Sequence, residues 1–486
     1  MVLRLFFFSF LIVLLGGIYG VLFSIHPLVG LVFLVVVVIG CIIWKEPAWG
    51  LLLVLFTISL QFLGKLNEDG SLTIAKVVTP CVVLVWFFKY LINKDKRLLQ
   101  VPFSHPILIS GFIYLVSTIP SFFNARNISI SICYLLFKLF PLWLLMVLIV
   151  DLLQTPKWLE RGYKTILLIS FVVGCFGIYE LITGQSILQL FGMKYYLISG
   201  AKEGGLASNK WEQFDFQEKS WVRVASTFLD PDFFASFLLL ILGFSFGFLF
   251  TTKSIFWRLF CIVLIVIALV DIVGTGSRSV FLGVFVSFLF LLAVVNFKGK
   301  WLLIGILVFL CVGIIPSIEE YIPSFRKGLP LSFEDFKQDP RYGFWLTALK
   351  MILKHPILGV GLGNFTEVYY HYRNEASILA KPYLPHNIVL LVFSETGIIG
   401  LVFFGLFVIT ILGTLIKNYF TKKNRMIWVL NLFIFASFVG YCVFALASNT
   451  LDQEYIWIVC GFVALFSKMK GEQNLCAQNI SYSEKY

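Results

Sequence analysis

The sequence predicts an all-α fold, a polytopic integral membrane bundle of about 12–14 transmembrane helices with two long polar loops. Of its 486 residues, 59% are hydrophobic and only 13% are charged, whereas soluble domains are about 45–50% apolar and about 25% charged. Apolar runs of about 17–25 residues, the length of a membrane-spanning helix, recur along almost the whole chain. These runs are continuous and do not alternate with polar residues, which excludes a transmembrane β-barrel.

Hydropathy places about 14 candidate spans along the chain. The first run, beginning MVLRLFFFSF, could pass for a signal peptide, but no small-residue cleavage site follows it, so we expect an uncleaved span. Two polar connections, 184–231 and 321–386, are long, and the others are brief. The candidate spans lie near residues 4–24, 27–44, 49–64, 73–92, 106–122, 131–154, 163–183, 232–252, 256–274, 279–297, 301–319, 388–415, 425–447 and 455–468.

Loop charges predict the orientation of these spans. About 20 of the 38 Lys and Arg residues fall in short loops on one side, against about three (Lys65, Arg126 and Arg278) in short loops opposite. Because Lys and Arg accumulate in cytoplasmic loops, both termini are expected inside and both long loops outside. The basic clusters are Lys89, Lys94, Lys96 and Arg97; Lys157, Arg161 and Lys164; Lys253 and Arg258; Lys298 and Lys300; Lys417, Lys422, Lys423 and Arg425; and Lys468 and Lys470, together with Arg4 and Lys45.

This topology divides the chain into six parts. They are N-terminal transmembrane helices (1–183), a first large extracytoplasmic loop (184–231), transmembrane helices with an outer turn at Arg278 (232–320), a second large extracytoplasmic loop (321–386), C-terminal transmembrane helices (387–468) and a polar cytoplasmic tail (469–486). We expect the tail, GEQNLCAQNISYSEKY, to be disordered.

Charge and cysteine content narrow the partners. The net charge of +12 would suggest nucleic acid for a soluble protein, but here the cytoplasmic loops account for it, so we expect no nucleic-acid partner. The nine cysteines are scattered, without a C-x-x-C pair, and predict neither a metal site nor a disulfide framework. The acids and histidines of the outer loops also lack metal-ligand spacing.

Arg278 lies in VGTGSRSVFLG, a tight link between two predicted spans. Gly274 and Gly276 supply the backbone freedom that such a turn needs. An interfacial arginine that reaches toward lipid headgroups is one interpretation. A positive charge in a short outer loop opposes the insertion bias, however, so a functional role is the alternative.

Arg341 opens RYGFWLTALKMILKHP, in which apolar residues recur at helical spacing. This predicts a short amphipathic helix along the outer surface, ended by His355-Pro356, with Arg341 and Trp345 on one face. The next residues, GVGLGNF, superficially resemble a nucleotide-binding loop, but no strand precedes them, so we expect a tight turn.

The first long loop ends in RVASTFLDPDFFASF, which places Arg223 just before a span that begins with proline. Asp230 or Asp232 is expected to cap that helix. If the predicted topology is right, Arg223 lies on the same side of the membrane as Arg278 and Arg341.

His386 lies where the second long loop re-enters the membrane, in PHNIVLLVFSETGIIG. A lone interfacial histidine can be purely structural. An imidazole near several guanidinium groups, however, suits a site that binds a polyanion and moves one proton. Glu395 would lie on the opposite side of a continuous helix from His386. We therefore expect Glu395 to pack inward and pair with a buried polar group.

At this point the motifs resemble a family. PHNIVLLVFSETGIIG resembles the H-N-x9-G-x-x-G pattern of bacterial O-antigen ligases, with His386-Asn387 leading to Gly397 and Gly400, and GSRSVFL resembles their R-x-x-x-L motif. The stretch from Arg341 through the glycine turn is similar to the arginine–tryptophan helix of the same superfamily, which includes O-antigen polymerases. RVASTFLDPDFFA is also similar, although the family often has Pro-Asn where this chain has Pro231-Asp232. The resemblance covers roughly residues 220–420.

The resemblance implies a GT-C-like glycosyltransferase that takes a glycan from undecaprenyl pyrophosphate, without metal or other cofactor. It would pass the glycan, with inversion, to an acceptor hydroxyl on lipid A-core or another envelope molecule, at the outer face of the bacterial cytoplasmic membrane. Arg278 and Arg341 would hold the pyrophosphate, and Arg223 is a further candidate for this role. His386 would orient or deprotonate the acceptor. Asn387 and Trp345 are the other expected binding residues.

Alternatives remain open at this stage. A polymerase of the same superfamily would use the same donor and extend another lipid-linked repeat, and a third type of enzyme would attach the glycan to protein or to another envelope acceptor. A polysaccharide flippase or transporter would be expected to carry ionisable residues within its spans, and Lys76, Lys138 and Asp271 lie within or near spans. No internal repeat supports a transporter.

Overall fold

The computed structural model describes residues 39–60, 74–92, 101–187, 213–216, 219–228, 230–295, 340–373, 384–421 and 424–483. Seven of its helices are long and apolar enough to cross a membrane, counting only these residues. The predicted fold class, a polytopic helical membrane protein, is confirmed. The candidate spans 4–24 and 301–319, and most of 27–44, lie outside the described residues, so the expected total of about 12–14 stays a prediction.

Helices make up nearly all of the described chain. In the first half they are α3 (Pro47–Ile58), α4 (Ile74–Ile92), η1 (Val101–Phe103), α6 (Pro106–Ser117), η2 (Ile119–Asn124), α7 (Ile128–Tyr134), η3 (Leu135–Leu139), α8 (Phe140–Leu152) and α9 (Pro156–Thr183). In the second half they are α13 (Pro231–Thr251), α14 (Ile255–Thr275), α15 (Arg278–Val294), α19 (Pro340–Lys354), α20 (Phe365–Tyr372), α21 (Ile388–Phe420), α22 (Arg425–Ala445) and α23 (Glu454–Ser483). The strands β1 (Gln213–Phe216) and β2 (Lys219–Val222) form an antiparallel hairpin in the first long loop.

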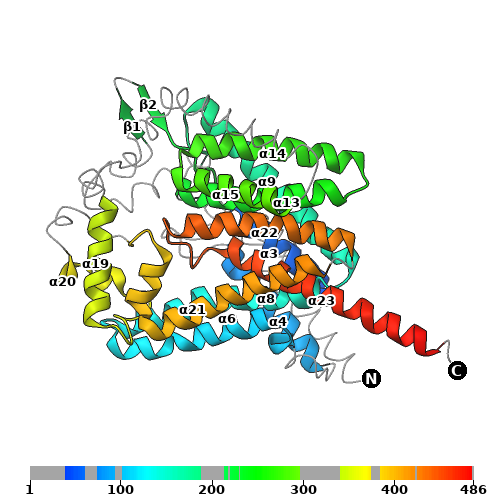
Figure 1. The fold of residues 1–486 in the computed structure, drawn as a ribbon, viewed down its shortest axis with the longest axis horizontal. Helices are drawn as coiled ribbons and strands as arrows, with labels where there is room; N and C mark the ends of the chain where they lie inside the picture. Colours follow the sequence, from blue (N-terminus) through cyan, green and yellow to red (C-terminus); the bar gives the residue numbers. More distant parts are fainter. Residues whose placement is uncertain are drawn as a thin grey trace, which may run out of the picture.

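The long helices run side by side, and α19 lies across one end of them (Figure 1). We call this end, which carries α19, the turn at Gly276 and the connection 446–453, the loop end. α23 extends toward the opposite end (Figure 1), which we call the basic end. An amphipathic helix at the predicted position is confirmed by α19, which ends at Lys354, just before His355-Pro356.

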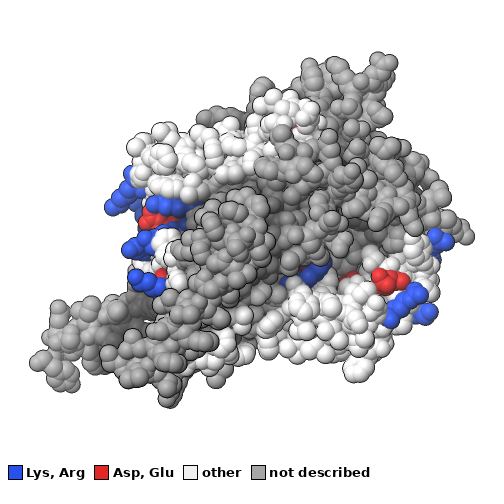
Figure 2. All heavy atoms as spheres, turned by 180° about the vertical axis from the view of Figure 1, so that it is seen from behind, with Lys and Arg blue, Asp and Glu red and all other residues white. Residues whose placement is uncertain are grey.

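Basic residues from separate segments meet at the basic end. The Lys89 ammonium donates to the Lys45 carbonyl at 3.0 Å. The Arg161 guanidinium stacks on Trp158, and the Lys164 ammonium lies 4.9 Å from the Trp257 ring centroid. On the face drawn in Figure 2, charged side chains gather near the two ends of the molecule, with mostly uncharged surface between them where it is described. Basic residues that the sequence assigns to separate cytoplasmic loops therefore lie at the same end of the bundle.

Two features differ from the expectations. The span expected near 49–64 begins as α3 but ends at Ile58, and the carbonyl of Ser59 accepts a hydrogen bond from Thr227 at 2.8 Å. The tail expected to be disordered continues α23 to Ser483 (Figure 1). Its Glu, Gln, Leu and Ala residues are good helix formers and it contains no proline, so the helix has no local reason to stop.

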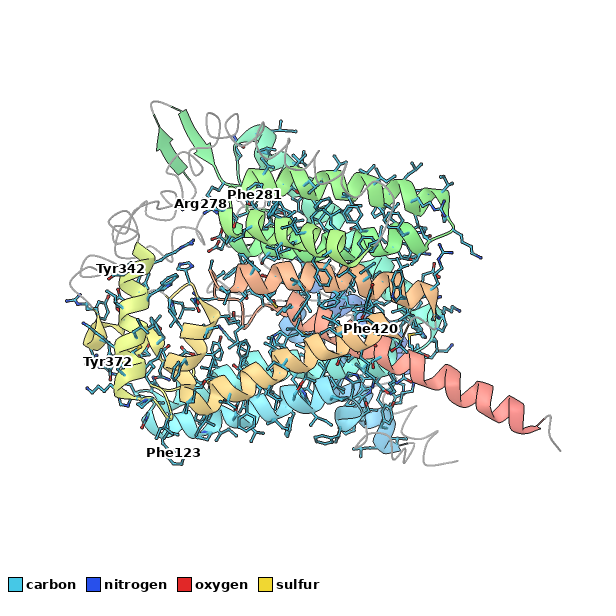
Figure 3. The ribbon with its side chains drawn as sticks, in the orientation of Figure 1. Phe123, Arg278, Phe281, Tyr342, Tyr372 and Phe420 are labelled. Carbon is cyan, nitrogen blue, oxygen red and sulfur yellow. The ribbon has the colours of Figure 1, made fainter. Side chains whose placement is uncertain are left out.

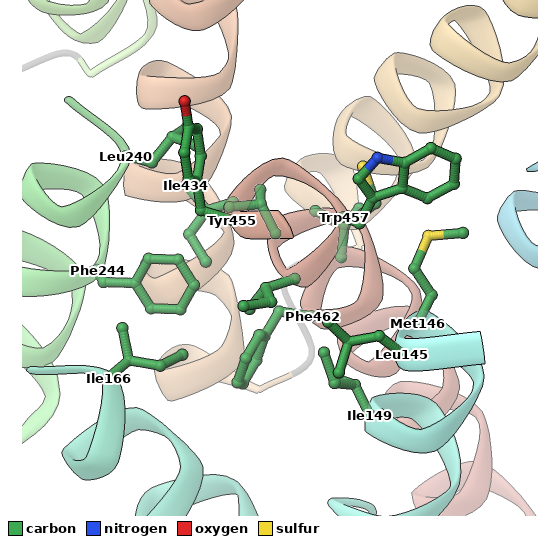
Figure 4. Packing of buried hydrophobic residues seen from close by; sticks show 14 of the residues in the cluster. Leu145, Met146, Ile149, Ile166, Leu240, Phe244, Ile434, Tyr455, Trp457 and Phe462 are labelled. Atoms are coloured by element: carbon green, nitrogen blue, oxygen red, sulfur yellow. The ribbon is translucent and has the colours of Figure 1, made fainter. Parts of the chain in front are cut away.

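The helices meet in an apolar core toward the middle of the bundle. Phe462 of α23 lies edge-on to Phe244 of α13 and to Tyr163 of α9, with ring centroids 5.3 Å apart in both pairs. Figure 4 shows side chains of α8 and α22 closing around the same centre. Edge-to-face aromatic pairs of this kind add about 0.5–1.5 kcal/mol each beyond the area they bury.

Small residues bring some helices into backbone contact. A Cβ atom on Gly283 of α15 would come within 2.8 Å of the Gly440 carbonyl oxygen of α22. A Cβ atom on Gly243 of α13 would come within 2.8 Å of the Phe433 carbonyl oxygen of α22. Such contacts replace the hydrophobic driving force that is missing between helices in lipid. They fix α13, α15 and α22 as one packed unit.

Candidate active site at the loop end

An arginine–carboxylate cluster joins three distant segments at the loop end. The Arg223 Nη2 atom lies 2.9 Å from Asp232 Oδ1, and the Arg341 Nη2 atom lies 3.9 Å from Asp232 Oδ2. The Arg223 and Asp232 side chains are only 15% and 13% exposed, whereas that of Arg341 is 36% exposed. Arg223 and Arg341 therefore lie in one cluster, and Asp232 is the group that joins them.

The turn that carries Arg278 contacts the same cluster. α14 ends at Thr275, Gly276 adopts a left-handed φ of 61°, and α15 begins at Arg278, as the tight-link prediction requires. The Arg223 Nε atom donates to the Thr275 carbonyl at 2.6 Å. Figure 3 shows Arg278 at the end of α15 nearest to α19, with Tyr342, the neighbour of Arg341, at the end of α19 nearest to α15. Arg278 is exposed, whereas Arg223 is half-buried.

The sequence predicted that either Asp230 or Asp232 caps α13, and the two residues have different roles. The Asp230 carboxylate accepts the Asp232 N–H at 2.7 Å and caps α13, which confirms the predicted cap. Asp232, in the first turn of α13, instead pairs with the arginines. Burial and the neighbouring Asp232 carboxylate raise the pKa of Asp230 to about 6.

A buried glutamate of α9 positions the segment that follows Arg223. One Glu180 oxygen accepts the backbone N–H groups of Ala225 and Ser226 at 2.9 and 2.8 Å, and the other accepts that of Ile187 at 2.9 Å. Ser226 holds a left-handed φ of 53°. Sequence reasoning missed Glu180. A carboxylate inside the apolar run GIYELIT was the available signal, because such a group needs partners within the membrane.

Trp345 links α19 to the segment that carries His386. The indole Nε1 atom donates to the Pro385 carbonyl at 2.7 Å. On the other face of α19, Phe344, Ala348 and Met351 are buried in a small apolar cluster with Leu391 of α21. Because Arg341 and Trp345 lie one helical turn apart, α19 carries an arginine toward Asp232 and an indole toward His386.

His386 is half-buried and is fixed through both of its neighbours. Its φ of 49° is left-handed, a conformation that costs a non-glycine residue energy and needs support from its surroundings. The Asn387 N–H donates to Asn449 Oδ1 at 3.2 Å, and the Asn387 side chain caps α21 by accepting from Val389 and Leu390. His386 is thus held between α19, through Pro385, and the connection 446–453, through Asn387.

Glu395 packs inward, as predicted, but its partners are backbone amides. Its carboxylate accepts the N–H groups of Gly363 at 2.9 Å and Phe365 at 3.2 Å, both from the predicted glycine turn. α21 does not continue as a regular helix, because Gly397 has φ 66° and ψ −168°. A Cβ atom on Gly397 would collide with the backbone of Ile357. Gly397, the first glycine of the Gly-x-x-Gly pair, therefore permits a break in α21 against which the glycine turn packs.

Comparison with known protein families finds a match in this part of the chain. Residues 263–405 match the family model described as O-Antigen ligase. No curated protein matches the chain. The matched stretch contains Arg278, Arg341 and His386, and the family match confirms the resemblance to the O-antigen ligase and polymerase superfamily.

Proposed function

We propose that this membrane enzyme transfers a glycan from undecaprenyl pyrophosphate to an acceptor hydroxyl, with inversion, at the extracytoplasmic face of the bacterial cytoplasmic membrane. The observation that carries the proposal is the Asp232-centred cluster of Arg223 and Arg341 beside the Arg278 turn. The family match supports a glycosyltransferase-like ligase or polymerase. The proposed transfer requires no metal.

The arginines would serve the donor. When the anomeric bond breaks, negative charge grows on the departing pyrophosphate, and cations fixed in advance stabilise that charge. Arg278 and Arg341 have the more accessible side chains and would bind phosphate oxygens through their guanidinium forks. Arg223 is more enclosed and already donates to Asp232 and to the Thr275 carbonyl, so its main role would be to hold the cluster in place.

His386 would serve the acceptor. An imidazole titrates near neutrality, so it can accept the proton of an attacking hydroxyl and release it to water. The hydroxyl oxygen forms the new bond to the anomeric carbon while the bond to the pyrophosphate oxygen breaks. Trp345 and Asn387 would keep the histidine segment in place through the contacts with Pro385 and Asn449.

A polymerase of the same superfamily is the second candidate, because only the acceptor differs. Attachment of the glycan to protein or to another envelope acceptor is a further variant of the same chemistry. A flippase or transporter finds less support. Lys138 is paired with Asp452, and the side chain of Lys76 lies outside the described residues. Under the enzyme proposal, replacing Arg278 or His386 should matter more than replacing Lys76 or Lys138.

The test is the glycan profile of a strain deleted for this gene and complemented with wild type or His386→Ala. A ligase predicts that polymer accumulates on its lipid carrier and that none reaches the acceptor without a functional copy. A polymerase predicts that single repeats reach the acceptor while long chains vanish. Full complementation by His386→Ala would overturn the catalytic role of His386.

A further inference from the structure

The connection 446–453, between α22 and α23, contacts the segment that carries His386. Asn449 in this connection accepts the Asn387 N–H, and the Trp457 indole donates to the Leu451 carbonyl at 2.9 Å. The connection is therefore held in place by Asn387, next to His386, and by Trp457, near the start of α23. It also carries Asp452, separated from Asn449 by about three residues, which is at most roughly 11 Å of chain.

Asp452 forms an ion pair with a lysine from a different part of the chain. The Lys138 Nζ atom lies 3.2 Å from Asp452 Oδ2 and 4.8 Å from the centroid of the Tyr134 ring. Lys138 belongs to η3, a π-helical turn that interrupts the span from Ile128 to Leu152. Single π-turns inside helices are often found at functional sites.

The pair is only partly covered. The side chains of Lys138 and Asp452 are 48% and 28% exposed. Lys138 follows the start of its span by about ten residues, or roughly 15 Å along the helix axis. Charged groups exposed at that depth are costly against lipid and are normally found facing water or a polar ligand. The pair is thus an accessible polar surface within the span, close in the chain to the residue that holds the His386 segment.

The place of His386 in the proposed reaction indicates which substrate would meet this surface. His386 would take the proton of the acceptor hydroxyl, so the acceptor sugar would lie against the His386 segment. The connection that holds this segment through Asn449 also carries Asp452, and Asp452 pairs with Lys138. The acceptor is therefore the substrate expected at the ion pair.

We propose that Lys138 and Asp452 form a subsite for a sugar residue of the acceptor. This inference rests on the proposed function. A sugar hydroxyl both donates and accepts, so two neighbouring hydroxyls can donate to the Asp452 carboxylate and accept from the Lys138 ammonium. The pair has no net charge, unlike the arginine cluster, which suits a neutral hydroxyl-rich ligand better than a second pyrophosphate.

The test measures acceptor and donor dependence separately, with the purified full-length enzyme in proteoliposomes. The donor is the carrier-linked glycan, and the acceptor is the unglycosylated fraction extracted from the deletion strain. Lys138→Gln and Asp452→Asn should each raise the KM for acceptor about tenfold or more, because each loses a charge-assisted hydrogen bond. The KM for donor should change less than about twofold.

The control is Glu160→Gln, which removes the ion pair between Glu160 and Lys164 at the basic end. It should leave both KM values as in the wild type. An unchanged KM for acceptor in both Lys138→Gln and Asp452→Asn would overturn the subsite while wild-type transfer upholds the proposed function. A wild-type enzyme that transfers nothing to the extracted fraction would overturn the proposed function, and the subsite with it.

A swapped pair separates binding from structural support. Lys138→Asp combined with Asp452→Lys keeps the ion pair but exchanges the donor and acceptor positions. The swapped variant should recover the wild-type melting temperature that the single variants lose. Its KM for acceptor should stay raised. If it restores both, the pair is a structural tie and the subsite is wrong.

Discussion

Each half of the candidate site contains a buried glutamate that accepts backbone N–H groups, but the helices that carry the two glutamates differ. In the arginine half, defined by Arg223 and the segment after it, Glu180 accepts backbone N–H groups from an irregular segment. In the histidine half, defined by α19, the glycine turn and His386, Glu395 does the same for Gly363 and Phe365. α9 stays regular around Glu180, whereas α21 breaks at Gly397, directly after Glu395 and Thr396.

The difference shows what each half requires of its sequence. Each half holds one non-glycine residue in the left-handed region, Ser226 in the arginine half and His386 in the histidine half. The histidine half also needs glycine at each close approach, because Gly359, Gly361, Gly363 and Gly397 all have left-handed φ values. A Cβ atom on Gly359 would meet the backbone of Glu395, just as one on Gly397 would meet that of Ile357. The histidine half should therefore be the less tolerant of substitution.

Gly397→Val should have the largest effect. Valine would be forced into the left-handed region and would also collide with the Ile357 backbone, for a combined cost of roughly 2–6 kcal/mol. We expect a large loss of thermal stability in detergent and no glycan transfer. Gly405→Ala, in the same helix with open space around it, should behave as the wild type. A stable, active Gly397→Val would show that α21 can run on without its break.

Replacing the two glutamates by leucine compares the halves directly. Glu180→Leu leaves the N–H groups of Ile187, Ala225 and Ser226 without their acceptor. Glu395→Leu does the same to two N–H groups of the glycine turn. At about 1–3 kcal/mol for each buried donor left unpaired, both variants should lose stability, and Glu180→Leu should lose more. Thermal unfolding of the purified proteins checks the order.

The corresponding glutamine variants serve as controls. Each keeps one acceptor oxygen, so its stability should fall between that of the wild type and that of the leucine variant. If Glu180→Leu unfolds at the wild-type temperature, the hydrogen bonds to the first loop do not support the fold.

Asp232→Ala should lower glycan transfer about tenfold to a hundredfold. It removes the carboxylate that pairs with Arg223 and Arg341, and a charge-assisted hydrogen bond contributes about 1.5–3 kcal/mol. Asp232→Asn keeps an oxygen acceptor and should recover most of the rate. Initial rates at varied donor concentration provide the measurement. Wild-type rates in Asp232→Ala would mean that other contacts fix the arginines.

The smallest effect is expected from Asp230→Asn, seen as a change in pH dependence. Burial and the neighbouring Asp232 carboxylate raise the pKa of Asp230 to about 6 in the folded protein, from its ordinary value of 3.8. The native state therefore holds its proton more tightly, and this group lowers the free energy of unfolding as pH rises from about 4 to about 6. Asparagine still caps α13, so the variant should lose this part of the pH dependence. Melting temperatures between pH 4 and 7 test it.

Local patterns made part of this site predictable. Pro340 and the helical spacing after it predict α19, the glycines before Arg278 predict its turn, and the Asp-Pro pair predicts the cap of α13. In each case the interacting residues are close in the sequence, so a short pattern contains the information. The resemblance then supplied an expected common role for Arg278, Arg341 and His386.

The remaining contacts join residues far apart in the chain. Glu180 meets Ser226, Asn449 meets Asn387, and Lys138 meets Asp452, each across a long stretch of sequence. Nothing local distinguishes these partners from other polar residues, because the contacts depend on how the helices pack. The early end of α3 has the same origin, since the partner of Ser59 is Thr227, in another part of the chain.

The backbone contact between Gly283 and Gly440 fixes a distance within the candidate site. Arg278 begins the helix that contains Gly283, and the connection with Asp452 follows the helix that contains Gly440. With no side chains between them, the two helices have little freedom to slide or separate at this point. The distance between Arg278 and the connection 446–453 is therefore set by two short helical segments. It is a fixed length that any pair of substrates must fit.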